Sequence, residues 1–226
     1  MLSLAHDEIE VVPFFLDTDE SIRLSDAEKW IDEEECERAA AFKFPIHRDR
    51  YVRGRGMLRL TLSEHMGCAP ESFGFSYGDK GKPFLQGADF HFNLSHSDKF
   101  AAVAVSRLPS VGIDIERFDR EVDIAGLSRR CFRPNEVKRI QNANGDRKAR
   151  AFFWTWTAKE ARMKATGEGF GLEPQKIEIE FADELPENCL QPVDPKAYLN
   201  AVDIPGWQVA CTVAATSPFR VRVREL

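Results

Sequence analysis

The sequence lacks the features of membrane, disulfide-rich and zinc-binding proteins. No apolar run in its 226 residues approaches the roughly 20 residues that cross a bilayer. The N-terminus, MLSLAHDEIE, reaches acidic residues too early for a secretory signal. The five cysteines are scattered, odd in number and without a CxxC pair, so neither a disulfide framework nor a zinc site is indicated. We therefore expect a protein of the reducing cytoplasm.

The chain also lacks an excess of positive charge. Its 31 Lys and Arg against 37 Asp and Glu give a net charge of -6, which argues against nucleic acid as the main partner. A local basic pocket for a small phosphorylated ligand remains compatible with this charge. No glycine-rich P-loop is present, so phosphates would have to be held by side chains or a metal.

The hydropathy pattern predicts an α+β fold. A hydrophobic content of 43% supports a packed core. The first half is predicted to contain a strand (8–17), a helix (27–42) after the capping-box spacing of Ser25 and Glu28, a helix (47–67), a short strand (71–77) and two extended segments within 90–106. The second half is predicted to contain a strand (111–118), short helices near 121–130 and 134–143, a long helix (146–166) and strands within 176–181, 197–202, 207–215 and 219–226. Because each half combines strands and helices, we expect two similar lobes, residues 1–108 and 109–226.

The segment VGIDIERF places two acids on one face of a predicted strand. Side chains alternate along a strand, so Asp114 and Glu116 point one way while Ile113 and Ile115 point the other, into a core. Two neighbouring carboxylates repel each other, and a divalent cation removes that repulsion. The alternatives are an exposed strand face or two salt bridges.

Polar and basic residues elsewhere have two interpretations each. In NLSHS, the residues Asn93, Ser95, His96 and Ser97 cap a turn or donate to phosphate oxygens. Lys82 stands in the turn GKP. The helix over 47–67 has several arginines, of which Arg48, Arg55 and Arg59 share one face. This face is either a phosphate-binding surface or a solvated one.

The long helix stacks Trp156, Glu160 and Lys164 one above another, with Lys159 beside the glutamate. Glu and Lys four residues apart are helix neighbours and often form only a surface ion pair. The functional alternative requires a partner for Glu160 elsewhere in the chain.

The order of these segments resembles a known family. ERAAAF, the arginine-bearing helix, GKPFL, FNLSHS, VGIDIE and WTAKEARMK are together similar to the 4'-phosphopantetheinyl transferases of the large, monomeric, surfactin-synthetase-activating type, over about residues 35–171. VGIDIE and WTAKEARMK match the family patterns G-[VI]-D-[IV]-E and W-[ST]-x-K-E-x-x-x-K without departure. Other members of the family are trimers about half this long, so the resemblance implies two fused lobes related by a pseudo-twofold axis.

The resemblance implies a reaction and its site. Coenzyme A gives its 4'-phosphopantetheine arm to a serine of an apo carrier protein, and 3',5'-ADP leaves. Asp114, Glu116 and Glu160 would hold Mg²⁺, with Mn²⁺ as an alternative, and Glu160 is also a candidate base. Lys164 would contact the pyrophosphate or leaving group, and Asp114 and Lys159 are further coenzyme-site positions. The positions that match the 3'-phosphate and adenosine contacts of the family are Arg38, Lys82, Ser95 and His96.

Two rival functions use the same residues. One is a Mg²⁺-dependent pyrophosphate hydrolase of coenzyme A-like nucleotides, and the other is a non-catalytic coenzyme A-binding protein. The basic segment SRRCFRPNEVKR, residues 128–139, is expected either to dock an acidic carrier helix or to form a solvated face.

Overall fold

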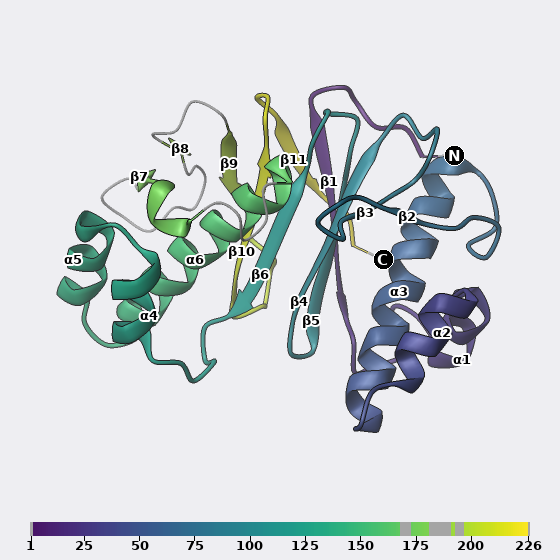
Figure 1. Ribbon diagram of the computed structural model, residues 1–226, viewed down its shortest axis with the longest axis horizontal. Helices are drawn as coiled ribbons and strands as arrows, with labels where there is room; N and C mark the ends of the chain where they lie inside the picture. The colour runs from purple at the N-terminus through teal and green to yellow at the C-terminus, as the bar shows by residue number, and fades with distance from the viewer. Residues whose placement is uncertain (1, 168–172, 181–190, 193–196, 226) are drawn as a thin grey trace.

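The computed structural model describes residues 2–167, 173–180, 191–192 and 197–225 (Figure 1). The first half contains β1 (Glu8–Phe15), α1 (Leu24–Trp30), α2 (Glu33–Ala40), α3 (Pro45–Met66), β2 (Ser76–Tyr77), β3 (Pro83–Phe84), β4 (His91–Ser97) and β5 (Phe100–Ser106). The second half contains β6 (Gly112–Arg117), α4 (Ile124–Cys131), α5 (Pro134–Asn142), α6 (Asp146–Thr166), the 3-10 turn η2 (Pro174–Lys176), β7 (Ile179–Glu180), β8 (Gln191–Pro192), β9 (Tyr198–Ala201), β10 (Val209–Ala215) and β11 (Arg220–Val223). The predicted α+β class is confirmed.

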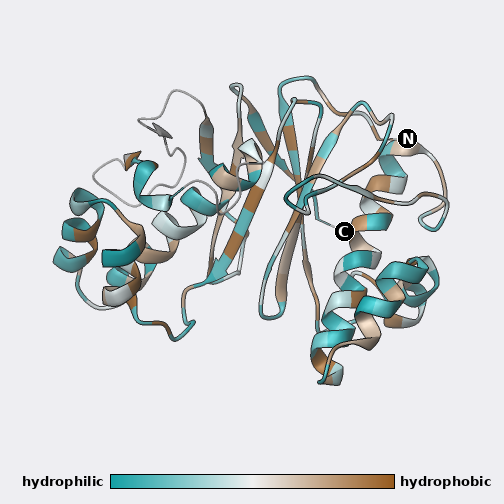
Figure 2. Ribbon diagram, in the orientation of Figure 1, coloured by the Kyte–Doolittle hydropathy of each residue, from teal (hydrophilic) through white to brown (hydrophobic). Residues whose placement is uncertain are grey.

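Two sheets face each other at the centre, and helices lie outside both (Figure 1). One sheet has the strand order β11-β1-β5-β4, and the other has the order β6-β10-β9. Hydrophobic residues recur along the central strands, whereas the helices at both ends carry many hydrophilic residues (Figure 2). Apolar side chains of both sheets, among them Ile9, Val11, Ile113 and Val213, form one shared core. The two predicted lobes are therefore joined by a continuous hydrophobic layer.

The expected helix over 27–42 is wrong as a single element. It divides into α1 and α2, because Asp32 accepts a hydrogen bond from the Glu35 backbone and Glu35 accepts one from the Asp32 backbone. This is the capping box of α2. The predicted box at Ser25 and Glu28 is not formed, since α1 begins after Arg23 without a side-chain cap.

The remaining helices follow the sequence closely. Pro45 begins α3, and Gly67, in the left-handed conformation, ends it as predicted. Gly56, an unfavourable residue inside a helix, is explained by helix packing: a Cβ there would lie 2.5 Å from the Cβ of Ala27 in α1. The helix predicted over 146–166 has the bounds of α6.

The C-terminal strand crosses to the first half of the chain. β11 pairs in parallel with β1, and its arginines face acids there: Arg220 pairs with Asp7, and Arg222 pairs with Glu8. The first sheet thus contains a strand from the second half. The division into residues 1–108 and 109–226 stays a prediction.

Candidate active site at the junction of the two sheets

Side chains of β4 bind the edge of β6. The oxygen of Asn93 accepts a hydrogen bond from the backbone N–H of Ile113 (2.9 Å), and the Ser95 hydroxyl accepts one from Ile115 (3.3 Å). Ser97 accepts from Arg117 in the same way (3.3 Å). The segment NLSHS is therefore a strand and not the predicted turn. The spacing of two between its polar residues was the signal for a shared strand face.

The same hydroxyls reach the two acids of β6. Ser95 donates to Asp114 Oδ1 (2.9 Å), and Ser97 donates to Glu116 Oε2 (2.5 Å). Both carboxylates are buried, with 6% and 9% of Asp114 and Glu116 exposed, while Ile113 and Ile115 are fully buried on the opposite side. The predicted alternation is thus confirmed. The exposed-face alternative is wrong because β4 covers the carboxylates.

Gly112 sets the distance between β6 and α6. A Cβ at this position would lie 2.2 Å from the Ala161 carbonyl oxygen and 2.4 Å from the Ala165 amide nitrogen. No real side chain tolerates such contacts, so only glycine permits this approach. Glu160 and Lys164 lie on the part of α6 that meets β6 here.

Lys164 and Glu160 face the carboxylates of β6. The Lys164 ammonium donates to Asp114 Oδ1 (2.6 Å), to Ser95 Oγ (3.1 Å) and to the Ile113 carbonyl (3.1 Å). Burial raises the pKa of Glu160, and the charge of Asp114 raises it further. Lys164 lowers this pKa and Glu116 raises it, so the net direction is upward. The partner that the sequence required for Glu160 is therefore the acidic face of β6.

The carboxylate oxygens of Asp114, Glu116 and Glu160 are of the kind that a hard cation binds, together with further oxygen ligands. Oδ2 of Asp114 is buried without a hydrogen-bond partner, and three carboxylates sit close enough to affect one another. Within the described residues, however, no group of three or more His, Cys, Asp or Glu side chains is arranged so that it could by itself hold a metal ion. Lys164 pairs with Asp114, and Arg120 pairs with Glu116 (2.5 Å), so the salt-bridge alternative is present here. A cation here would therefore depend on waters and substrate phosphates as well, which Mg²⁺ commonly keeps as ligands.

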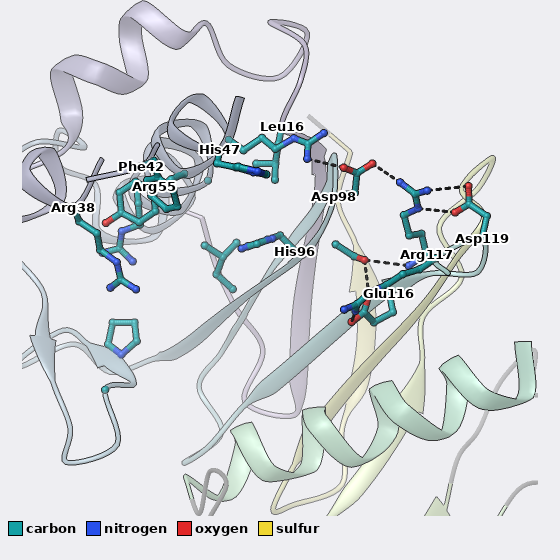
Figure 3. A pocket seen from close by; sticks show the side chains of 18 of the residues that line it. Leu16, Arg38, Phe42, His47, Arg55, His96, Asp98, Glu116, Arg117 and Asp119 are labelled. Atoms are coloured by element: carbon teal, nitrogen blue, oxygen red, sulfur yellow. Dashed lines mark hydrogen bonds and ion pairs between the residues drawn. The ribbon is translucent and has the colours of Figure 1, made fainter. Parts of the chain in front are cut away.

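A cavity of about 920 Å³ borders the acidic face of β6 at Glu116 (Figure 3). Of the predicted site residues, Arg38, His96 and Glu116 line it. Figure 3 shows Arg38 and Arg55 on one side, Glu116 on the other, and His96 between them. Burial lowers the pKa of His96, and the charges of Lys164 and Arg50 lower it further, against Asp114, which raises it. The cavity thus joins a basic end to the acidic face of β6.

The arginines of α3 are mostly engaged in structural ion pairs. Arg59 is fully buried and binds Glu35 (2.7 Å) and Asp32 (2.6 Å), whereas Arg48 pairs with Glu28 (2.5 Å). Arg59 therefore forms neither a phosphate-binding nor a solvated surface, whereas Arg48 forms an ion pair on the solvated surface. Their partners come from α1 and α2, which the periodicity of α3 alone does not reveal.

Arg55 is the exception among these arginines. Its Nε binds Glu35, and its guanidinium lies 4.4 Å from the centre of the Phe75 ring. Arg55 also lines the cavity, and its buried Nη2 has no hydrogen-bond partner. This arginine is held in place and retains capacity for an anion.

Two residues that were predicted to bind coenzyme A, Lys159 and Lys82, are instead hydrogen-bonded to other parts of the protein. Lys159 is 1% exposed, pairs with Glu136 (2.9 Å) and donates to the Pro174 carbonyl (2.9 Å), so it points toward α5 and η2. Lys82 donates to the carbonyls of Val111 (2.8 Å) and Lys164 (2.7 Å), and burial lowers its pKa to about 8. Lys82 thus ties the connection between β2 and β3 to the start of β6 and to α6, and its contact with the 3'-phosphate stays a prediction.

Comparison with known proteins defines the class of this site. The family model described as 4'-phosphopantetheinyl transferase superfamily matches residues 110–211, and the one described as 4'-phosphopantetheinyl transferase, N-terminal, matches residues 19–108. The chain belongs to the 4'-phosphopantetheinyl transferase superfamily, and the enzyme class expected from the sequence is confirmed.

Individual relatives agree with this assignment. The chain is 36% identical over 212 residues to the 4'-phosphopantetheinyl transferase HetI of Nostoc sp., covering 92% of this chain and 84% of the relative. It is 29% identical over 153 residues to a 4'-phosphopantetheinyl transferase of Bacillus subtilis, covering 67% and 66%. It is 38% identical over 120 residues to the 4'-phosphopantetheinyl transferase gsp of Aneurinibacillus migulanus, covering 53% and 49%.

Proposed function

We propose that this protein transfers the 4'-phosphopantetheine arm of coenzyme A to a serine hydroxyl of an apo carrier protein and releases 3',5'-ADP. The observation that supports this most is the meeting of Asp114, Glu160 and Lys164 beside Glu116 on the acidic face of β6. Glu116 in turn lines one side of a cavity that has Arg38 and Arg55 on its other side. Such an arrangement suits a nucleotide with a phosphate at each end. Asp114, Glu116 and Glu160 are the proposed ligands of Mg²⁺, or of Mn²⁺, which when bound would neutralise charge on the pyrophosphate.

The side chains of the protein divide the chemistry among them. The serine oxygen forms a bond to the phosphorus that carries the pantetheine arm, and the bond from that phosphorus to the oxygen of 3',5'-ADP breaks. Glu160 takes the serine proton as the general base. Lys164, whose ammonium already lies at Asp114, donates to the phosphate oxygens as charge develops on the leaving group.

Intact mass measurement tests the function. Purified apo acyl, polyketide and peptidyl carriers are incubated with coenzyme A, Mg²⁺ and the protein, and the mass of each carrier is recorded. We expect at least one carrier to gain the phosphopantetheine mass. Cleavage of coenzyme A with every carrier unmodified would instead support the hydrolase, and binding without cleavage would support the non-catalytic alternative.

The basic end of the cavity is the proposed 3'-phosphate site. Arg38→Ala should weaken the binding of coenzyme A roughly tenfold or more and the binding of dephospho-coenzyme A much less. The reason is that a charge-assisted hydrogen bond contributes about 1.5–3 kcal/mol. Isothermal titration with both ligands measures this difference. Lys29→Ala, an exposed cation of α1 outside the cavity, is the matched control.

His96→Ala and Lys82→Ala complete this test. If both residues bind the 3'-phosphate, they should show the same preference as Arg38→Ala. Equal weakening of the two ligands by Lys82→Ala would identify Lys82 as a tie to β6 and α6. Equal weakening by Arg38→Ala would reject the proposed phosphate site.

The carrier is proposed to dock on the basic surface of α4 and α5. In the segment 128–139, Arg129, Arg130 and Lys138 are exposed. Arg133 is held by Glu178 and by the Gln175 carbonyl (3.0 Å), so its replacement would also disturb the fold. The test is therefore limited to the exposed residues.

Arg130→Glu should raise the KM for the carrier and leave coenzyme A affinity unchanged, since an acidic partner would be repelled. Lys29→Glu in the other lobe serves as the control for a charge reversal elsewhere. Steady-state kinetics at two salt concentrations measure both effects. A carrier KM equal to that of the unmodified protein would exclude Arg130 from docking.

The setting proposed for this enzyme is the cytoplasm, as a monomer without nucleic acid or membrane partners. The four cysteines within the described residues are unpaired, which suits a reducing compartment. No described helix combines the length and apolar character that a bilayer crossing requires.

A further inference from the structure

Ser97 of β4 makes two hydrogen bonds to β6. Its oxygen accepts from the Arg117 backbone N–H (3.3 Å), and its single hydroxyl hydrogen goes to Glu116 Oε2 (2.5 Å). Ser97 is 6% exposed, so water does not replace either partner readily. The backbone contact thus fixes the serine, and the serine fixes one carboxylate oxygen.

The two oxygens of Glu116 differ as a result. Oε2 is bound to the buried Ser97 of β4, whereas Oε1 is bound to Arg120, whose side chain is 51% exposed. Arg120 lies in the connection between β6 and α4 and lines the cavity together with Glu116. Because half of the Arg120 side chain is exposed, water solvates its charge when it leaves Glu116, and another cation then takes its place.

We propose that Ser97 is a positioning residue for Glu116. It holds Oε2 so that Oε1, now paired with Arg120, is the oxygen available to a divalent cation. This inference rests on the proposed function, because it takes Glu116 as a metal ligand. Partners that orient a ligating carboxylate typically change metal affinity 10- to 100-fold when removed.

Mn²⁺ binding tests the proposal without any transfer reaction. Free Mn²⁺ is measured by electron paramagnetic resonance in the presence of saturating coenzyme A and no carrier. Ser97→Ala should weaken the binding of Mn²⁺ about tenfold. Ser97→Thr, which retains the hydroxyl, should keep most of the Mn²⁺ affinity. Should Ser97→Ala fail to fold, Ser97→Cys replaces it, because a thiol is a weak donor.

Ser106 provides a matched control. It is also buried, donates to the Glu8 carbonyl (2.6 Å) and accepts from the Leu108 backbone (3.2 Å), but no site carboxylate is involved. Ser106→Ala should reduce thermal stability and leave Mn²⁺ affinity unchanged. An equal loss of Mn²⁺ affinity in Ser106→Ala would make the Ser97 effect merely structural and overturn the proposal.

A double-mutant cycle separates this inference from the proposed function. Glu116→Gln should itself weaken Mn²⁺, and adding Ser97→Ala should then cause little further loss. The same loss in both backgrounds, or none from Ser97→Ala alone, would overturn the role of Ser97 while the metal site stands. If Glu116→Gln leaves Mn²⁺ affinity unchanged, the metal role of Glu116 fails, and the role of Ser97 fails with it.

Discussion

Glu160→Gln should slow transfer by about a hundredfold or more even at saturating Mg²⁺, whereas Asp114→Asn should regain part of its rate as Mg²⁺ rises. Glu160 is proposed as both ligand and base, and general-base catalysis contributes about 10²- to 10⁴-fold. Added metal restores occupancy but not proton transfer. Asn at position 114 still offers an oxygen to Ser95 and Lys164, which bind Asp114 Oδ1 in the native protein.

Single-turnover transfer to a carrier across a Mg²⁺ titration measures both variants side by side. Asp119→Asn is the control, because Asp119 lines the cavity but pairs with Arg117 and is largely exposed. Gln keeps the size of Glu160, so circular dichroism should show an unchanged fold. Recovery of Glu160→Gln to the level of Asp114→Asn would make Glu160 a ligand only and assign the base to another group.

Gly112→Ala should both destabilise the protein and impair transfer. The new Cβ would lie 2.2 Å from the Ala161 oxygen and 2.4 Å from the Ala165 nitrogen, which are backbone atoms that move only if α6 moves. Overpacking of this kind costs about 1–3 kcal/mol. Because a shift of about 1 Å at catalytic groups can cost 10²-fold, we expect a loss of that order as Glu160 and Lys164 leave β6.

Urea unfolding and single-turnover transfer measure the two effects separately. Gly74→Ala is the matched control, since a Cβ there meets no atom within 4 Å. A variant that is less stable but transfers at the normal rate would give Gly112 a purely structural role. Normal stability would show that β6 and α6 separate without cost.

The sequence predicted the elements of the site better than their surroundings. The alternation in β6 and the spacing of Glu160 and Lys164 along α6 follow from covalent geometry, so the structure confirms both. The missed boundary between α1 and α2 depends on Glu35, whose side chain caps α2 and is also bound by Arg55 and Arg59 of α3. Local propensity contains no information about such partners.

Long charged side chains mark the limit of what the sequence determined. The hydrophobic periodicity and the sequence motifs alone indicated the family, the strand with Asp114 and Glu116, and the helix with Glu160 and Lys164. Only the tertiary structure decided that Lys164 reaches Asp114 while Lys159 turns to Glu136, and that Arg59 is buried while Arg38 lines the cavity. The physical reason is that helical spacing fixes the direction in which a side chain leaves the backbone. Its burial and its partner depend on elements far away in the sequence, which only folding brings together.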